Sequence, residues 1–246
     1  MNLEGRVILV TGGGRRLGRA IALTLGRAGA WIAVHHHASR DGALDVVREL
    51  AGRGATFEAD LSDANAAADL VDRVLADRGR LDGLVLNAAT FRETPFGTVR
   101  EADWDGVFAV NLKSPFFIAQ RAAPALKKRG GAALLISDVS AENPWVDYLP
   151  YCLTKTGIDG LTRALAKVLA PEARANAIAP GPALPPAGGD PEAHAAIAAT
   201  TLLGRFGEAA DVANTAKFLM EADYVTGQIV AVDGGQGINR DRPSSD

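Results

Sequence analysis

Short apolar runs alternate along the chain with longer segments in which apolar positions recur at helical spacing. Most runs are almost continuously apolar, as is typical of strands buried on both faces of a parallel sheet, and the helical segments supply the covering layers. The pattern predicts an α/β fold, a single-domain Rossmann-type doubly wound parallel sheet of about seven strands flanked by helices. The runs are RVILV (6–10), WIAVHH (31–36), ATFEA (55–59), LDGLVLN (81–87), AALLIS (132–137), ARANAIA (173–179) and QIVAV (228–232).

The helical segments carry their own start signals. Leu17, Ile21 and Leu25 recur at four-residue spacing, which marks the inward stripe of the first helix. Ser62 and Asp63 are candidate caps for a helix that runs to about residue 78.

Stop signals and breaks divide the second half of the chain. The longest helical pattern, 101–129, ends at Gly130-Gly131. The Pro- and Gly-rich segment 180–196 predicts a loop that covers the substrate, and the conformation of 182–200 stays open. No break in composition divides the chain, so we expect one domain over 1–240 and a frayed tail over 241–246.

Composition restricts the classes of molecule that the protein is expected to bind. With 48% hydrophobic residues and a net charge of −3, the chain can bury a full core and has no general attraction to nucleic acid or an anionic membrane. Cys152 is the only cysteine, which excludes an intrachain disulfide and fits a reducing compartment. The chain begins with MNLEGRVILV, without the features of a targeting segment. We therefore expect a cytoplasmic protein whose substrate is a small molecule.

The stretch TGGGRRLG, Thr11 to Gly18, lies between the first strand and the first helix. Glycines there let the backbone approach a phosphate closely, and the helix N-terminus favours its negative charge. A nucleotide-triphosphate loop is excluded because Arg19-Ala20 replaces the required Lys-Ser/Thr. Taken alone, the motif also fits a structural turn.

Tyr151 and Lys155 form Y-x-x-x-K at the start of a helical pattern, so both side chains lie on one helix face. A nearby ammonium favours the phenolate, which predicts a lowered tyrosine pKa and a usable acid at neutral pH. Along nearly the whole chain, the sequence resembles the short-chain dehydrogenase/reductase family. The resemblance rests on this pair and on Gly12, Gly14, Gly18, Asn87-Ala88-Ala89, Asn111, Pro180-Gly181 and Asp233-Gly234-Gly235.

The resemblance implies roles for individual residues. Tyr151 would donate the proton, Lys155 would tune it and hold the nicotinamide ribose, and Asn111 would position a water in the proton relay. Asn87 would line the cofactor cleft, and Asp60 would contact adenine. The alternatives are a helix cap or buried structural amide for Asn111 and a turn residue for Asp60.

Two positions depart from the family pattern and a third accompanies them. Arg16 occupies the middle glycine position of T-G-x-x-x-G-x-G, and Asp138 stands thirteen residues before Tyr151, where the family usually has serine. Phe91 follows Asn87 by four residues. These features resemble the pteridine reductase and dihydromonapterin reductase branch, in which the aromatic stacks the pterin and the arginine faces the substrate. An ordinary core position is the alternative for Phe91.

The chemistry of Asp138 is consistent with that branch. An ionised carboxylate beside Tyr151 would oppose deprotonation of the phenol, whereas a protonated carboxyl could donate a hydrogen bond to a ring nitrogen. A pterin offers such nitrogens, and a ketone offers only a carbonyl oxygen. The alternative for Asp138 is a carboxylate that caps a turn at the strand end.

The end of the second strand indicates NADP(H) as the cofactor. Enzymes that prefer NAD usually have Asp or Glu there, whereas this chain has HHHASR and no carboxylate before Asp41. Adjacent strand residues point to opposite faces, so the histidines do not favour a metal site. The predicted cofactor site comprises Gly12, Gly14, Arg15, Arg16, Leu17, Gly18, His35, His37, Ser39, Arg40, Asp60, Leu61, Asn87, Ala88, Ala89, Lys155, Pro180 and Gly181.

The predicted function is NADPH-dependent reduction of a pteridine, such as dihydrobiopterin or a dihydrofolate-like compound, with Arg16, Phe91, Asp138 and Tyr151 at the substrate. Reduction of a 3-oxoacyl thioester or another small ketone is the alternative enzyme, and a catalytically silent NADPH-binding sensor is the alternative of another class. The resemblance also implies a homotetramer built partly on the helices around 101–129 and 151–170.

Overall fold

Seven parallel strands form one sheet in the order β3-β2-β1-β4-β5-β6-β7. The structure is a computed structural model and describes residues 1–185 and 190–239. The sheet confirms the predicted fold class, and the order reverses between β1 and β4, where such folds form a ligand crevice. The strands are β1 (Val7–Val10), β2 (Trp31–His36), β3 (Gly54–Glu58), β4 (Gly83–Leu86), β5 (Ala132–Ile136), β6 (Arg174–Pro180) and β7 (Ile229–Val232).

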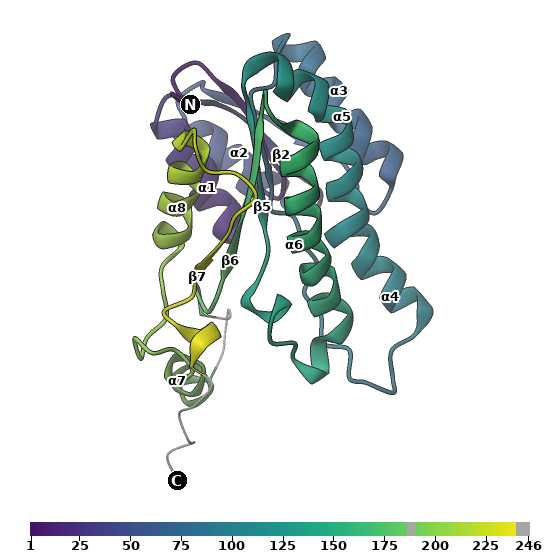
Figure 1. Cartoon of the computed structure of the whole chain (residues 1–246), viewed down its shortest axis with the longest axis vertical. Helices are drawn as coiled ribbons and strands as arrows, with labels where there is room; N and C mark the ends of the chain where they lie inside the picture. The colour runs from purple at the N-terminus through teal and green to yellow at the C-terminus, as the bar shows by residue number, and fades with distance from the viewer. Residues whose placement is uncertain (186–189, 240–246) are drawn as a thin grey trace.

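Helices cover both faces of the sheet (Figure 1). One layer contains α1 (Arg16–Arg27), α2 (Arg40–Glu49) and α8 (Ala209–Glu221). The other contains α3 (Ala64–Arg78), α4 (Glu101–Phe108), α5 (Ser114–Arg129) and α6 (Leu149–Leu169). The remaining helix, α7 (Pro191–Ala199), lies beyond the carboxyl ends of the strands, at the lower end of the view.

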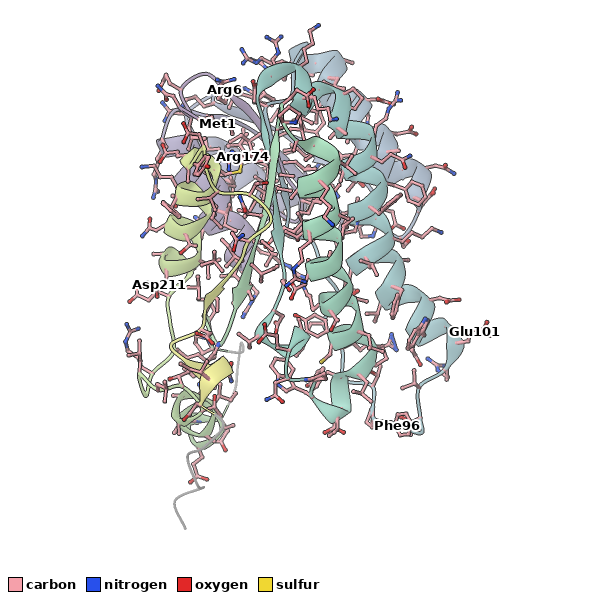
Figure 2. The ribbon with its side chains drawn as sticks, in the orientation of Figure 1. Met1, Arg6, Phe96, Glu101, Arg174 and Asp211 are labelled. Atoms are coloured by element: carbon pink, nitrogen blue, oxygen red, sulfur yellow. The ribbon has the colours of Figure 1, made fainter. Side chains whose placement is uncertain are left out.

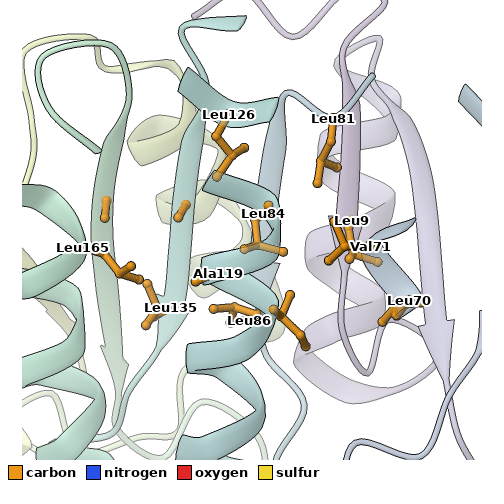
Figure 3. Packing of buried hydrophobic residues seen from close by; sticks show 14 of the residues in the cluster. Leu9, Leu70, Val71, Leu81, Leu84, Leu86, Ala119, Leu126, Leu135 and Leu165 are labelled. Carbon is orange, nitrogen blue, oxygen red and sulfur yellow. The ribbon is translucent and has the colours of Figure 1, made fainter. Parts of the chain in front are cut away.

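Successive side chains along each strand point to opposite faces of the sheet, so the hydrophobic core has two parts. Val7 and Leu9 of β1 pack toward α3 and α5, whereas Ile8 and Val10 pack toward α1 and α8. Figure 3 shows the first of these clusters, in which Leu9 and strand residues from β4 and β5 meet the helices. Each fully buried leucine contributes about 1.5–3 kcal/mol to folding.

The amino-terminal edge of the sheet carries one buried carboxylate and several partly buried arginines. Asp82 is fully buried and accepts hydrogen bonds from Arg6 at 3.0 Å and from Arg80 at 2.7 Å. Arg174 donates to the carbonyls of Met220 and Val225, both at 2.9 Å, which satisfies the end of α8. Figure 2 shows Arg6 and Arg174 at this edge, away from the carboxyl ends of the strands.

The predicted continuous helix over 101–129 is interrupted. Residues Ala109–Lys113 form a π-helical turn between α4 and α5, and the helix ends at Gly130 (φ 62°), as expected. Such turns are rare and often lie at functional sites, and sequence periodicity gives no sign of them. The cap prediction for α3 is confirmed, because the Asp63 side chain accepts a hydrogen bond from the Asn65 amide.

The predicted loop 180–196 is partly helical, since α7 begins at Pro191 with Asp190 as its side-chain cap. Residues 186–189 and the predicted tail 241–246 lie outside the described residues. Within the described part of the chain, no helix combines the length and apolarity needed to cross a membrane.

Candidate active site

A cavity of about 600 Å³ lies at the carboxyl ends of the central strands. It brings together most of the predicted site residues, whereas Gly14, Arg40 and Asn111 are not part of its lining. The predicted residues that line it are Gly12, Arg15, Arg16, Leu17, Gly18, His35, His37, Ser39, Asp60, Leu61, Asn87, Ala88, Ala89, Phe91, Asp138, Tyr151, Lys155, Pro180 and Gly181. The lining also includes Ala38, Thr90, Val110, Ile136, Ser137, Ala183 and Leu184, which the sequence analysis did not select.

The glycine-rich turn allows a close backbone approach at the start of α1. A Cβ atom on Gly18 would lie 2.1 Å from the Gly12 carbonyl oxygen, so only glycine fits there. Arg16 has a φ of 48°, the left-handed conformation that favours glycine, which explains the glycine of the family pattern at this position. Gly14 instead packs against the start of α2, where its Cβ would lie 2.9 Å from the Ala43 nitrogen.

His35, one of the predicted cofactor-site residues, is a neutral side chain that braces the wall of the cavity. Its Nδ1 accepts a hydrogen bond from the Gly12 amide at 3.0 Å, and its Nε2 lies 3.2 Å from the Ala59 carbonyl oxygen. Burial lowers its pKa from 6.5 to about 4, so the ring is neutral at physiological pH. Arg40 is exposed as the first residue of α2. The positive side chains that do line this end of the cavity are Arg15 and Arg16.

Asp60 has a turn role, which was the alternative weighed for it. Its carboxylate accepts hydrogen bonds from the Ser62 amide at 2.9 Å and the Ser62 hydroxyl at 2.8 Å. These bonds hold the pKa of Asp60 below its usual value. The residue also lines the cavity, so the predicted contact with a bound ligand stays a prediction.

Thr11 joins the ends of β1 and β4 behind the glycine-rich turn. Its hydroxyl oxygen accepts hydrogen bonds from the amides of Asn87 at 2.9 Å and Ala88 at 3.0 Å, and the hydroxyl donates to the Val85 carbonyl at 3.3 Å. The Asn87 side-chain amide in turn donates to the Thr11 carbonyl at 2.9 Å. One hydroxyl therefore holds two walls of the cavity together.

Replacing Thr11 with valine is expected to lower the free energy of unfolding by about 2 kcal/mol or more, because two backbone amides lose their acceptor at almost unchanged volume. Urea denaturation monitored by circular dichroism measures the change. Thr56→Val, on the edge strand β3, is the matched control. Equal stability losses in the two variants would contradict the role assigned to the Thr11 hydroxyl.

Asn111 lies in the π-helical turn and is a buried structural amide. Its Oδ1 accepts hydrogen bonds from the Thr90 amide at 2.8 Å and the Thr90 hydroxyl at 3.1 Å. Its Nδ2 donates to the Thr90 carbonyl at 2.9 Å and to the Thr154 hydroxyl at 3.4 Å. These four bonds use the full capacity of the side-chain amide, as expected for the structural alternative, and the predicted role of Asn111 in positioning a relay water stays a prediction.

Tyr151 and Asp138 form the polar centre of the cavity. The Tyr151 hydroxyl donates a hydrogen bond to Asp138 Oδ2 at 2.8 Å, and Asp138 Oδ1 accepts one from the Ser140 amide at 2.8 Å. Burial raises the pKa of Tyr151 well above its usual value, and the neighbouring Asp138 carboxylate raises it further. This reverses the predicted lowering by Lys155, so the phenol is protonated at neutral pH.

Lys155 is buried one helical turn from Tyr151. Its ammonium donates a hydrogen bond to the Ile136 carbonyl at 2.8 Å and lies 5.4 Å from the centre of the Tyr151 ring. Burial lowers the pKa of Lys155, against the opposing effects of Asp138 and Asp159. The phenol and the ammonium therefore meet at one wall of the cavity, as the Y-x-x-x-K spacing predicts.

A cluster of aromatic rings lies beside the cavity, and two of its members, Phe91 and Tyr151, line the cavity. Phe91 is 58% exposed, so it is not the core residue that was its alternative. Its ring stacks on Tyr148 with centroids 4.6 Å apart and planes 5° apart, and meets Tyr151 edge-on at 4.9 Å. The Trp145 ring belongs to the same cluster, with its centroid 6.3 Å from the centroid of Phe91. Cys152 is buried, and its sulfur accepts a hydrogen bond from the Trp145 backbone amide at 3.4 Å.

A doubly wound sheet with a glycine-rich turn at β1 and a Tyr-Lys pair beside β5 defines a dinucleotide-dependent oxidoreductase of the short-chain type. A family model described as "Enoyl-(Acyl carrier protein) reductase" matches residues 13–236. The chain belongs to the short-chain dehydrogenase/reductase family.

Similar curated proteins come from bacteria and a fungus. A 3-oxoacyl-(acyl-carrier-protein) reductase of Staphylococcus aureus is 36% identical over 239 residues, covering 92% of this chain and 96% of that protein. The enzyme of the same name from Thermotoga maritima is 34% identical, covering 96% and 99%. The short-chain dehydrogenase mdpC of Emericella nidulans is 33% identical, covering 95% and 96%. All three support membership of the short-chain dehydrogenase/reductase family.

A solved structure supports the same conclusion. A blue fluorescent protein from a metagenomic library, crystallised in complex with NADPH, has a TM-score of 0.90 at 33% identity and covers 96% of this chain and 99% of that one. The fold of the whole chain is therefore shared with a protein that holds NADPH.

Proposed function

We propose that the protein is an NADPH-dependent reductase of small carbonyl compounds, with 3-oxoacyl thioesters as the leading substrate class. The similarity to 3-oxoacyl-(acyl-carrier-protein) reductases over nearly the full chain carries this proposal. The Tyr151 hydroxyl and the Lys155 ammonium at one wall of the cavity supply the groups that carbonyl reduction needs. The sequence-based preference for pteridines therefore becomes the second candidate.

The cavity fits the cofactor. The close approach at Gly18 and the N-terminus of α1 suit a pyrophosphate, and Arg15 with Ser39 suits a 2′-phosphate. Asn87 and Lys155 line the inner part, where the nicotinamide end would lie. When bound there, NADPH supplies the hydride.

Tyr151 is the proton donor in this proposal. Its raised pKa keeps the hydroxyl protonated, and it can give that proton to the oxygen that gains charge as a carbonyl is reduced. The Lys155 ammonium stabilises the phenolate that remains. Asp138 accepts a hydrogen bond from the same hydroxyl, so it orients the phenol.

Ala38→Asp tests the assignment of the cofactor. A carboxylate at this cavity position would repel a 2′-phosphate and could bind a 2′-hydroxyl. Because a charge-assisted hydrogen bond contributes about 1.5–3 kcal/mol, we expect the ratio of NADPH to NADH affinity to fall roughly tenfold or more. Titration of nicotinamide fluorescence measures both affinities. Ala38→Ser is the uncharged control, and an unchanged ratio in Ala38→Asp would place the 2′-phosphate elsewhere.

Pteridine reduction remains a second candidate because of two observations at the substrate end. Asp138 contacts the Tyr151 hydroxyl where most family members have serine, and a carboxyl can bond to a ring nitrogen. The exposed Phe91 ring, which its stack on Tyr148 holds in place, offers a flat face to a heteroaromatic ring.

We also propose a homotetramer. An apolar hollow lies between α4, α5 and α6, lined by Phe108, Leu112, Phe116, Phe117 and Leu161 among others. Exposed apolar surface of this kind favours association with a second copy. Light scattering coupled to size exclusion gives the molar mass, and a monomer at micromolar concentration would reject the tetramer.

One comparison of substrates separates the candidate functions. Oxidation of NADPH is followed by absorbance with an acetoacetyl thioester, dihydrobiopterin and dihydrofolate at equal concentrations. Turnover of the thioester above both pteridines supports the leading proposal, and the reverse order supports the second candidate. Tight NADPH binding without turnover of any substrate would favour the silent binding protein.

A further inference from the structure

A buried carboxylate lies one helical turn beyond Lys155 on the same face of α6. Asp159 is 8% exposed and Ser137, at the end of β5, is 1% exposed. The Ser137 hydroxyl donates a hydrogen bond to Asp159 Oδ1 at 2.5 Å and lies 3.4 Å from the Lys155 carbonyl oxygen. The neighbouring residue on β5, Ile136, accepts the hydrogen bond of the Lys155 ammonium at 2.8 Å. The end of β5 therefore holds the side chains of both Lys155 and Asp159.

We propose that Asp159 is a positioning residue for the reaction. Ser137 orients the Asp159 carboxylate, and that carboxylate keeps the buried Lys155 side chain charged. Four-residue spacing on a helix brings opposite charges into contact range, and burial protects their attraction from screening by salt. The inference rests on the proposed function, in which the Lys155 ammonium stabilises the Tyr151 phenolate.

The charged groups around this pair act in the direction that the proposal requires. Three titratable groups surround Lys155: Asp138 at the end of β5, and Tyr151 and Asp159 on α6. The two carboxylates raise the pKa of Lys155 against the lowering effect of burial. The pKa of Asp159 is raised above its usual value, mainly by burial, while Ser137, Arg163 and Lys155 oppose the rise and Glu142 adds to it. Asp159 is held by one hydroxyl, and two nearby cations favour its ionised form.

Charge and hydrogen bonding can be separated at this position. An asparagine oxygen accepts the same hydrogen bond from Ser137, so Asp159→Asn keeps the packing and the bond but removes the charge. A residue that only fastens α6 to β5 would tolerate that change. A residue that keeps Lys155 charged would not.

The full chain with NADPH bound provides the test, using Asp159→Asn, the charge-retaining Asp159→Glu and the control Glu142→Gln. Glu142 is exposed, and its replacement changes the net charge equally. NMR of [ε-¹³C]lysine follows the titration of Lys155, since the chain has six lysines and Lys155→Met identifies its signal. The pH profile of kcat/KM gives the second readout with any accepted substrate.

In Asp159→Asn, the Lys155 titration and the alkaline limb of the profile are expected to move to lower pH by about one unit. Asp159→Glu should restore both toward wild type, and Glu142→Gln should leave both unchanged. An unshifted Lys155 signal in folded Asp159→Asn would overturn the inference.

A wild-type measurement covers the case in which Asp159→Asn does not fold. The ¹³C carboxyl signal of Asp159 must report an ionised group at pH 7, and a protonated carboxyl there would overturn the inference. Both NMR readouts work without a substrate. An absence of turnover would therefore reject the proposed function while the lysine titration still decides the role of Asp159.

Discussion

Tyr151→Phe is expected to reduce kcat by about 100-fold to 10,000-fold, the contribution typical of a general acid. Phenylalanine keeps the ring that packs edge-on against Phe91 but has no proton to donate. The hydrogen bond from the hydroxyl to Asp138 is lost as well. NADPH affinity should stay within a few-fold of wild type, because the hydroxyl acts on the substrate.

Absorbance of NADPH at saturating substrate measures kcat in this variant, and nicotinamide fluorescence measures the affinity. Tyr224→Phe is the matched control, since Tyr224 is fully exposed. Wild-type turnover in Tyr151→Phe would remove the phenol from the mechanism. A parallel loss of NADPH binding would assign Tyr151 to the cofactor site instead.

Asp138→Ser is expected to change substrate preference and pH dependence together. A serine hydroxyl suits a carbonyl oxygen, whereas the carboxyl suits a ring nitrogen, so the kcat/KM ratio of acetoacetyl thioester to dihydrobiopterin should rise about tenfold or more. The sign follows from the lost interaction with a pteridine and from the 3-keto oxygen of the thioester substrate, which gains a neutral donor.

The pH profile of Asp138→Ser has a definite direction. The Asp138 carboxylate raises the pKa of both Tyr151 and Lys155, so removing it lowers both values. The alkaline limb of kcat/KM should therefore move to lower pH. Asp147→Ser, with an exposed carboxylate on the neighbouring turn, is the control. An unaltered substrate ratio and an unaltered profile would leave Asp138 as a cap for the Ser140 amide alone.

The apolar pattern predicted the sheet because strand burial is a local property of the sequence. Runs such as AALLIS, which includes β5, are apolar at every position that faces a helix layer, and all seven predicted runs coincide with strands. The start of α3 at Asp63 and the end of α5 at Gly130 followed from the chemistry of single residues. The π-helical turn at Asn111 escaped prediction because its surrounding residues suit a continuous α-helix.

For the predicted site residues, the chemical role was harder to predict than the location in the fold. His35 lines the cavity, but its ring is neutral because burial lowers its pKa, and both ring nitrogens contact the backbone. Arg40 has the right charge for a phosphate and lies outside the cavity lining. Asn111 has the predicted type of side chain, yet Thr90 and Thr154 use its whole hydrogen-bonding capacity.

The class of fold, the glycine-rich turn and the shared helix face of Tyr151 and Lys155 could be predicted from the chain alone, since each depends on residues close together in the sequence. The pKa values of Tyr151 and Lys155 could not, because they depend on the folded surroundings. The Tyr151 pKa is raised, not lowered, because burial and the contact with Asp138 outweigh the ammonium one turn away. The Ser137 bond to Asp159 likewise joins a strand end to a helix, and burial and contacts between distant residues arise only when the chain folds.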